Sequence, residues 1–151
     1  MKTYARLLAL LLLLSTTGAS AVQESLLMMR STQSFPETML ALQKRLGEYG
    51  YTISRVQRVD IGLTSSGFQT DKYRIVFYGK PNEIRDLSKK HPELIPYLPL
   101  KLTLFAEQDE TLLVALDPTM LRDVVDDEEF HYTLQRWKND ILSIMDEIRE
   151  Y

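Results

Sequence analysis

The second half of the chain contains two apolar runs that only a short turn separates, and in the first of them apolar residues alternate with polar or aromatic ones. Leu100, Leu102 and Leu104 occupy every second position at the start of residues 100–107, and residues 111–116 form the second run. Alternate side chains of a strand lie on opposite faces, so the first run predicts a strand with one buried face. The second run is predicted to be a strand that pairs back on the first. The intervening three residues are a hairpin length. The fold must therefore contain an antiparallel sheet.

Three further segments are predicted to be strands: residues 25–30, 51–59 and 72–78. The alternation of the second segment slips between Ile53 and Val56, which predicts a β-bulge. The third segment alternates regularly and places Tyr73 and Tyr78 on opposite faces of the sheet. Residues 60–71 contain two glycines and two adjacent serines, so we predict a long loop or hairpin tip there.

A strong helix signal follows the first predicted strand. Ser34 and Glu37 have the spacing of a capping box, and Gly50 supplies a C-terminal stop. Pro36 is tolerated because the first helical turn has no partner for its missing N–H group. The predicted helix covers residues 35–49, and one face is apolar: Phe35, Met39, Leu42, Leu46 and Tyr49.

The last segment of the chain predicts a longer amphipathic helix, capped by Asp126 or Asp127. Its apolar stripe spans five turns: Phe130, Leu134, Trp137, Ile141, Ile144 and Ile148. A short helix is predicted from Asn82 to Lys90, and three prolines after it (92, 96 and 99) predict an extended crossing. The order strand–helix–strand–strand–short helix–strand–strand–helix predicts an α+β fold, an antiparallel sheet with helices on one face.

The first 21 residues are typical of a cleavable signal peptide. Lys2 and Arg6 precede an apolar run of eight residues, and small residues precede a cleavage site before Val22. The run gives about 12 Å of helix, whereas a bilayer core is about 30 Å thick, so we expect no stable membrane insertion after cleavage. We expect residues 22–151 to form a single domain in the periplasm, or outside the cell as the alternative. Within it, the final amphipathic helix occupies about residues 127–150.

Composition excludes several classes of function. The absence of cysteine excludes disulfides, thiolate metal sites and cysteine nucleophiles. The chain has a net charge of −3; the signal segment holds two of its 18 basic and none of its 21 acidic residues, so the remainder has −5. A protein that binds nucleic acid through phosphates needs a basic surface. We therefore expect no nucleic-acid partner, and we identify no cofactor and no metal ligand set.

Several short motifs occur in a distinctive order after the capped helix. A strand leads into Gly79-Lys80-Pro81, the segment Tyr97-Leu98-Pro99-Leu100-Lys101 follows, and a hairpin ends in Asp117-Pro118. This order resembles the family called domain of unknown function 302, over about residues 26–118. The resemblance implies a small α+β domain related in shape to the TATA-box-binding-protein fold, often dimeric, with no established activity.

The chain departs from the family pattern at two places. Family members commonly show an Asp-His pair where this sequence has Asp60-Ile61, and Gly-Asn-Pro where it has Gly79-Lys80-Pro81. Any family chemistry that depends on that histidine is therefore missing here. The departure favours a binding or structural role over an enzyme.

Four residues are candidates for ligand binding. Lys80 belongs to the local basic cluster with Arg85 and residues 89–91, and an anion bound there would have Tyr78 and Tyr97 nearby. Phe105 can line an apolar cleft between sheet and helices together with strand tyrosines. Core packing and solvated helix faces are the simpler explanations for these residues.

The two histidines offer the alternative function. His91 and His131, with Asp117, could form a hydrolytic or metal site, although neither histidine belongs to a motif with ligand spacing. Five carboxylates within residues 123–129 lack the order of a calcium loop. We therefore assign no catalytic residue and expect an exported, non-catalytic module that binds a small ligand or an envelope protein, or pairs with itself. A homodimer would use a sheet edge or the exposed side of the final helix.

Overall fold

The computed structural model describes residues 25–149, so the predicted signal peptide lies outside the described residues. One antiparallel sheet organises the chain, with strand order β1-β5-β4-β3-β2. The strands are β1 (Leu26–Ser31), β2 (Thr52–Arg58), β3 (Tyr73–Gly79), β4 (Leu100–Glu107) and β5 (Glu110–Leu116). The helices are α2 (Phe35–Glu48), α3 (Val59–Ser65), α4 (Pro81–Lys90) and α5 (Glu128–Arg149), with short 3₁₀ helices η1 (Pro92–Tyr97) and η2 (Pro118–Asp123). The predicted α+β class is confirmed.

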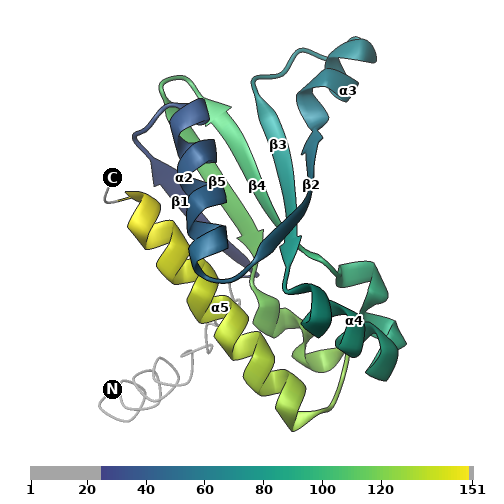
Figure 1. Cartoon of the computed structure of the whole chain (residues 1–151). Coiled ribbons are helices and arrows are strands. Elements are labelled where there is room, and N and C mark those ends of the chain that lie inside the picture. Colours follow the sequence, from purple (N-terminus) through teal and green to yellow (C-terminus); the bar gives the residue numbers. More distant parts are fainter. Residues whose placement is uncertain (1–24, 150–151) are drawn as a thin grey trace, which may run out of the picture.

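Two helices cover one face of the sheet, which we call the inner face. In Figure 1, α2 and α5 lie in front of the strands, while α4 and the 3₁₀ helices lie at the lower end of the sheet. The face on the opposite side, the outer face, is not covered by any of the helices in residues 25–149. The described part of the chain contains no helix that is both long enough and apolar enough to cross a membrane.

The helix α2 forms as its sequence predicts. The backbone amide and the hydroxyl of Ser34 both donate to the carboxylate of Glu37, at 3.1 and 2.7 Å. These bonds satisfy groups that have no partner inside the helix. Gly50 ends the helix with a φ of 76°, a left-handed conformation that glycine adopts without steric cost. The helix therefore begins and ends where local chemistry requires.

The predicted stripe of α5 is the centre of the hydrophobic core. Trp137, Leu134 and Ile148 are fully buried, and the other predicted positions of the stripe are at most 2% exposed. Asp127 caps the helix by accepting a hydrogen bond from the amide of Phe130 at 2.9 Å. Apolar residues of β3, β4 and β5 meet this stripe from the sheet: Val76, Leu102, Leu104 and Leu113. Burial of these large side chains is the main stabilising contribution in a domain without disulfides.

The β-bulge that the sequence predicts in β2 is confirmed. The pairing of β2 with β3 shifts register between Ile53 and Arg55. The alternation of β3 is also as predicted, because Val76 and Tyr78 are buried on the inner face while Tyr73 lies on the outer face.

Three local predictions are wrong. Within residues 60–71, predicted to be a loop, the chain continues α3, where the hydroxyls of Ser65 and Ser66 donate to carbonyl oxygens four residues earlier. The proline-rich crossing is the 3₁₀ helix η1 rather than extended chain, because Pro92 occupies a first-turn position and the buried Leu94 anchors it. The N-cap position of the short helix α4 is Lys80 rather than Asn82, and no side chain caps the helix there. Pro81 has the backbone angle of a first helical residue, so the helix starts earlier.

The glycine of the Gly79-Lys80-Pro81 motif is required by close packing. A Cβ atom at Gly79 would lie 2.7 Å from Cγ1 of Ile84, which is shorter than a van der Waals contact. The chain turns directly from β3 into α4 at this point, so the first turn of the helix lies against the end of the strand. The glycine permits that approach.

Candidate functional site

The outer face of the sheet carries many apolar residues on β1, β5, β4 and β3, whereas β2 presents Arg55 and Gln57 there. One row across the strands contains Met28, Val114, Thr103 and Ile75, and the neighbouring row contains Arg30, Leu112, Phe105 and Tyr73. Met28 is 54% exposed and both Leu26 and Leu116 are 45% exposed. An antiparallel sheet with one solvated face normally places polar residues there. This face therefore departs from the usual pattern.

A cavity of about 190 Å³ opens where two strands of the sheet separate. The pairing of β4 with β5 ends at Leu102 and Ala115, so Leu100 and Lys101 have no partner on β5. The same two residues still pair with β3. The cavity is consequently lined by residues of both faces of the sheet and by Ile141 of α5.

The hydroxyl of Tyr78 is a buried polar group that needs an explanation. Tyr78 is fully buried and lines the cavity, and its hydroxyl has no hydrogen-bond partner. Burial, with a smaller contribution from the negative charge of Asp140, raises the pKa of the hydroxyl well above its usual range. The group is therefore a neutral donor and acceptor at physiological pH. Native interiors rarely leave such a group unpaired.

The environment of Tyr78 contrasts with that of the adjacent Tyr51. The two rings pack edge to face, with centroids 5.4 Å apart. The hydroxyl of Tyr51 donates to Oδ2 of Asp140 at 2.7 Å, so the carboxylate already has this donor. Nη1 of Arg136 lies 3.7 Å from Oδ2 of the same carboxylate. Tyr51 and Asp140 are thus hydrogen-bonded to each other, and the Tyr78 hydroxyl stays unpaired.

The structure brings two of the four predicted ligand-binding residues together. Tyr78 and Tyr97 both line the cavity. Lys80 instead lies over the ring of Tyr51, with Nζ 4.9 Å from the centroid. Phe105 lies on the outer face, where it packs edge to face against Tyr73 at 5.9 Å. The predicted set is therefore divided between the cavity, the inner side of the sheet end and the outer face.

Sequence reasoning did not single out the cation at this cavity. Lys101 is exposed and lines the cavity, and no ion pair is found for it among the residues that the structure describes. Thr103 and Leu116 line the same opening. The signal was present in the Leu-Pro-Leu-Lys motif, which ends on Lys101.

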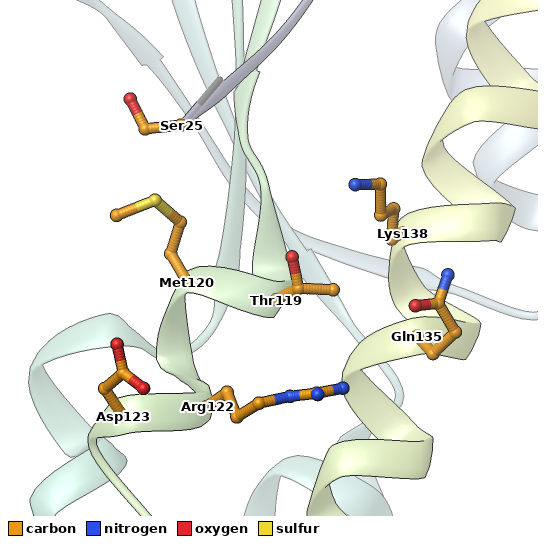
Figure 2. A pocket seen from close by; sticks show the side chains of 7 residues that line it. All are labelled: Ser25, Thr119, Met120, Arg122, Asp123, Gln135 and Lys138. Atoms are coloured by element: carbon orange, nitrogen blue, oxygen red, sulfur yellow. The ribbon is translucent and has the colours of Figure 1, made fainter. Parts of the chain in front are cut away.

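A second hollow, of about 410 Å³, is polar and lies between η2 and α5. Figure 2 shows Arg122 extending across it toward Gln135, with Lys138 above and Asp123 on the opposite wall. Lys138 is already paired, because its Nζ lies 2.5 Å from Oδ2 of the buried Asp117. A bound anion would compete with Asp117 for this lysine and would face the Asp123 carboxylate. The hollow is therefore a weaker ligand site than the cavity beside Tyr78.

The three residues of the alternative catalytic site have separate partners. His91 packs against Phe130, and its Nε2 lies 3.3 Å from Oδ2 of Asp127. His131 instead contacts the carbonyl oxygen of Val125 through Nε2 at 3.0 Å. Within residues 25–149 there is no group of three or more histidines and carboxylates that could hold a metal ion.

Asp117, the third member, is a buried structural group. Burial alone would raise its pKa, but hydrogen bonds from Lys138 and from Thr119 outweigh that effect and lower it. Its Oδ1 accepts from the amide and the hydroxyl of Thr119 at 2.9 and 2.7 Å, which caps η2. The hydrolase or metal-site alternative is not favoured.

The acidic segment before α5 also has local partners. Lys90 lies 2.7 Å from Oδ2 of Asp127 and 3.1 Å from Oε2 of Glu129. The pKa of Asp127 is strongly lowered, first by Lys90 and then by the amide of Phe130. Asp127 therefore caps α5, and the ion pairs of Lys90 connect the end of α4 to the start of α5.

Comparison with known proteins identifies the family. The family described as Domain of unknown function DUF302 matches residues 27–148, a range that includes α5. None of the curated proteins compared with the chain matches it. The fold is similar to a crystal structure of an uncharacterized conserved protein DUF302 from Bacillus stearothermophilus, with a TM-score of 0.75 and 19% identity; the similarity covers 83% of this chain and 99% of the other. The match over most of the sequence, together with the sheet and its helices, shows that the chain belongs to the DUF302 family.

Proposed function

We propose that the protein is an exported, non-catalytic interaction domain that pairs with a second copy of itself through the outer face of its sheet. The observation that carries the proposal is the apolar character of that face. Met28, Leu26 and Leu116 are large, apolar and about half exposed, and they lie beside partly buried neighbours on the same face. Contiguous apolar surface of this kind marks an interaction site in a folded protein.

The dimensions of the outer face suit a second copy. Five strands about 4.8 Å apart, with about seven residues each at about 3.3 Å, give a projected area on the order of 500 Å². The helix α3 projects beyond the ends of β2 and β3 in Figure 1, and Ile61 and Phe68 expose further apolar area there. A stable interface buries about 800 Å² on each partner. The relief of the side chains adds to the projected area of the sheet and brings the available surface toward that scale.

In a twofold pairing of two sheets, each subunit needs only one apolar surface to form the dimer. In a twofold dimer the same patch is used on both subunits, so an apolar face needs only to be complementary to itself. Two sheets pack face to face at about 10 Å with their side chains interdigitated. This face-to-face contact replaces the sheet edge and the outer side of α5 as the proposed interface.

The separate engagement of the candidate catalytic residues supports a non-catalytic role. His91 lies against Asp127 and His131 against a backbone carbonyl, while Asp117 is bound by Lys138. General acid–base catalysis requires groups within hydrogen-bond reach of one reacting centre. These three groups instead stabilise three different junctions of the fold.

The oligomeric state tests the proposed contact. Light scattering coupled to size-exclusion chromatography on residues 22–151 should give a mass of about 30 kDa, twice the roughly 15 kDa of one chain. Met28→Asp should shift the population to monomer, since it places like charges on the paired faces. Leu40→Asp is the matched control, because Leu40 is 70% exposed on α2 and away from the outer face. A wild-type monomer at about 100 μM would reject the dimer.

Export is tested independently of pairing. Expression of the full chain in a Gram-negative host, followed by fractionation, should place it in the periplasm with an N-terminus at Val22. Replacement of Leu10 and Leu12 by arginine interrupts the apolar run and should leave the uncleaved chain in the cytoplasm. A wild-type chain that stays uncleaved in the cytoplasm would contradict export.

A further inference from the structure

The cavity between β4 and β5 opens on the outer face, at the position where the pairing of the two strands stops. Leu26 and Leu116 pair with each other there, while Lys101 of β4 pairs only with Phe77 of β3. Leu116 and Lys101 both line the opening. A molecule that enters the cavity therefore passes between an apolar side chain and a cation.

The accessible walls of this cavity are chiefly apolar. Leu26, Leu116 and Tyr97 are exposed at its rim. Its floor comes from apolar residues that keep a little exposed surface, Leu100, Ala115, Leu121 and Ile141. Tyr78 has no exposed surface, so its hydroxyl takes no part in binding. The half-buried Thr103 is the polar exception on the wall, so a hydrocarbon body without polar substituents matches the lining.

Lys101 provides the charge at the opening. It is exposed, and among residues 25–149 no ion pair is found for it. The residues that line the cavity include no aspartate or glutamate of the described chain. A carboxylate at the opening therefore gains attraction from Lys101 without facing a like charge, and it stays in contact with water. The polar hollow beside η2 differs, because its Lys138 is paired with Asp117.

The size of the cavity limits the length of the hydrocarbon body. An apolar cavity of about 150 Å³ accommodates benzene, which has six carbons. This cavity has a volume of about 190 Å³, so it has room for a tail on the order of six carbons. A sugar or a nucleotide is too large and too polar for such a lining.

We propose that this cavity binds a short-chain fatty acid of about six carbons, with its carboxylate beside Lys101 and its tail on the apolar floor. The inference goes beyond self-pairing, and every group that it uses belongs to one chain. Leu26 and Leu116 lie at the opening and also on the outer face. The acid and a second copy of the chain therefore compete for this end of the sheet.

Two probes with equal numbers of carbons test the role of the charge. Isothermal titration calorimetry at pH 7 and low ionic strength should show hexanoate binding about fivefold more tightly than hexanol. In Lys101→Gln, the affinity for hexanoate should fall by about that factor, while the affinity for hexanol stays unchanged. Lys89→Gln is the matched control, because Lys89 is exposed on α4 and does not line the cavity. A Lys101→Gln variant that keeps the preference for the acid would overturn the position of the carboxylate.

A pair of substitutions on adjacent strands tests the cavity itself. Thr103 and Ile75 are cross-strand partners on the outer face, and both are half-buried, but only Thr103 lines the cavity. Thr103→Trp should fill the space and weaken both probes by about tenfold, whereas Ile75→Trp should leave their affinities unchanged. Circular dichroism verifies that both variants fold. Equal effects of the two substitutions would contradict binding in this cavity.

The length of the acid measures the depth of the site. Lengthening butanoate to hexanoate should raise the affinity by about tenfold, because two more methylene groups are buried. Decanoate should gain little over hexanoate, since the cavity is already filled. An affinity that rises by the same factor with every methylene group up to decanoate would indicate adsorption to the outer face and would overturn the proposed site.

NMR on the wild-type chain locates the acid without any substitution. Methyl signals of Val114, Leu116 and Leu121, which line the cavity, should shift on addition of hexanoate, while those of Leu40 on α2 should not. Shifts spread equally over both groups would contradict a single site.

The variant Leu112→Asp makes the failure of this proposal distinguishable from the failure of the proposed pairing. It places a charge on the outer face outside the cavity lining, so it should keep the chain monomeric. Hexanoate should bind this monomer at least as tightly as it binds the wild type. A Leu112→Asp monomer that does not bind hexanoate at about 10 mM would overturn the ligand site. A wild-type chain that is monomeric by light scattering and binds hexanoate refutes only the dimer.

Discussion

The inner and outer faces of the sheet are both apolar, but only one of them is covered. On the inner face, Leu104 and Leu113 are completely buried beneath α2 and α5. On the outer face, Leu112 and Val114 are half-buried by their neighbours and Leu116 is 45% exposed. Residues that differ by one position on the same strand therefore have opposite environments.

This difference shows that the hydrophobicity of a strand does not decide which of its faces the chain itself covers. Alternation along β5 is weak, because leucine, valine or alanine occupies five consecutive positions, 112–116. The helices provide one apolar stripe each, on α2 and α5, and both stripes are used on the inner face. The outer face has no such partner within residues 25–149 and is available for association.

The largest effect should come from a matched pair of substitutions on adjacent residues of β5. Leu113→Ala removes a fully buried side chain and should lower the free energy of unfolding by about 3 kcal/mol. Leu112→Ala, on the outer face, should cost only about 1 kcal/mol at a protein concentration that keeps the chain monomeric. Urea denaturation of both variants measures the difference. Equal losses in the monomer would show that the two faces are equally buried and would break the comparison.

A smaller effect is expected at Asp117, a carboxylate that is only 1% exposed. Asp117→Asn weakens the contact with the partly exposed Lys138, so stability at pH 7 should fall by about 2 kcal/mol. The pKa of Asp117 is lowered in the folded state, so its stabilisation is present above the unfolded value of about 3.9 and is lost as pH falls through the folded pKa.

The difference between wild type and Asp117→Asn should therefore shrink when urea titrations are repeated below about pH 4. Asp123→Asn is the control, because Asp123 is exposed on η2 and should change stability by less than about 0.5 kcal/mol. A difference that stays constant from pH 7 to pH 3 would show that the charge of Asp117 is not what stabilises this junction.

The smallest expected effect is an increase in the free energy of unfolding, and it concerns Tyr78, beside the cavity where the two faces of the sheet meet. Tyr78→Phe should raise the free energy of unfolding by about 1 kcal/mol, because it removes a buried hydroxyl that has no partner. Tyr51→Phe should lower it by about 1 kcal/mol, since its hydroxyl donates to Asp140. Thermal and urea denaturation of the two variants give the signs. Destabilisation by Tyr78→Phe would indicate that its hydroxyl is paired in the folded protein.

Much of the fold was predictable from local sequence signals. The capping box at Ser34, the left-handed Gly50 and the bulge after Ile53 are each encoded within a few residues. The α3 helix was missed because its glycine and serines favour loops on average. In the structure, Ser65 and Ser66 bind carbonyl oxygens of the helix itself, and Arg74 pairs with Asp60 at its start. That last contact joins α3 to β3 and cannot be found from local composition.

The candidate site was only partly predictable. The tyrosines 78 and 97 were identified as aromatic residues close to a basic cluster, and both line the cavity. Lys80 was placed in the same group because it is near in sequence, yet its ammonium lies over Tyr51. Apart from its place at the end of the Leu-Pro-Leu-Lys motif, nothing in the local sequence distinguishes Lys101 from other exposed lysines, although it also lines the cavity. Proximity to the cavity depends on where β4 leaves β5, and that separation is a property of strand pairing between distant residues.

The amino-acid sequence by itself determined the family, the α+β class and the buried stripe of α5, because residue periods, helix caps and motif order are short-range properties. Tertiary structure alone decided which apolar face would be left uncovered and where a cavity would open. Both depend on how two helices are distributed over a five-stranded sheet and on which strand pairs separate at their ends. Tyr78 illustrates the division: its alternation places it on the inner face, but only the packed structure leaves its hydroxyl without a partner.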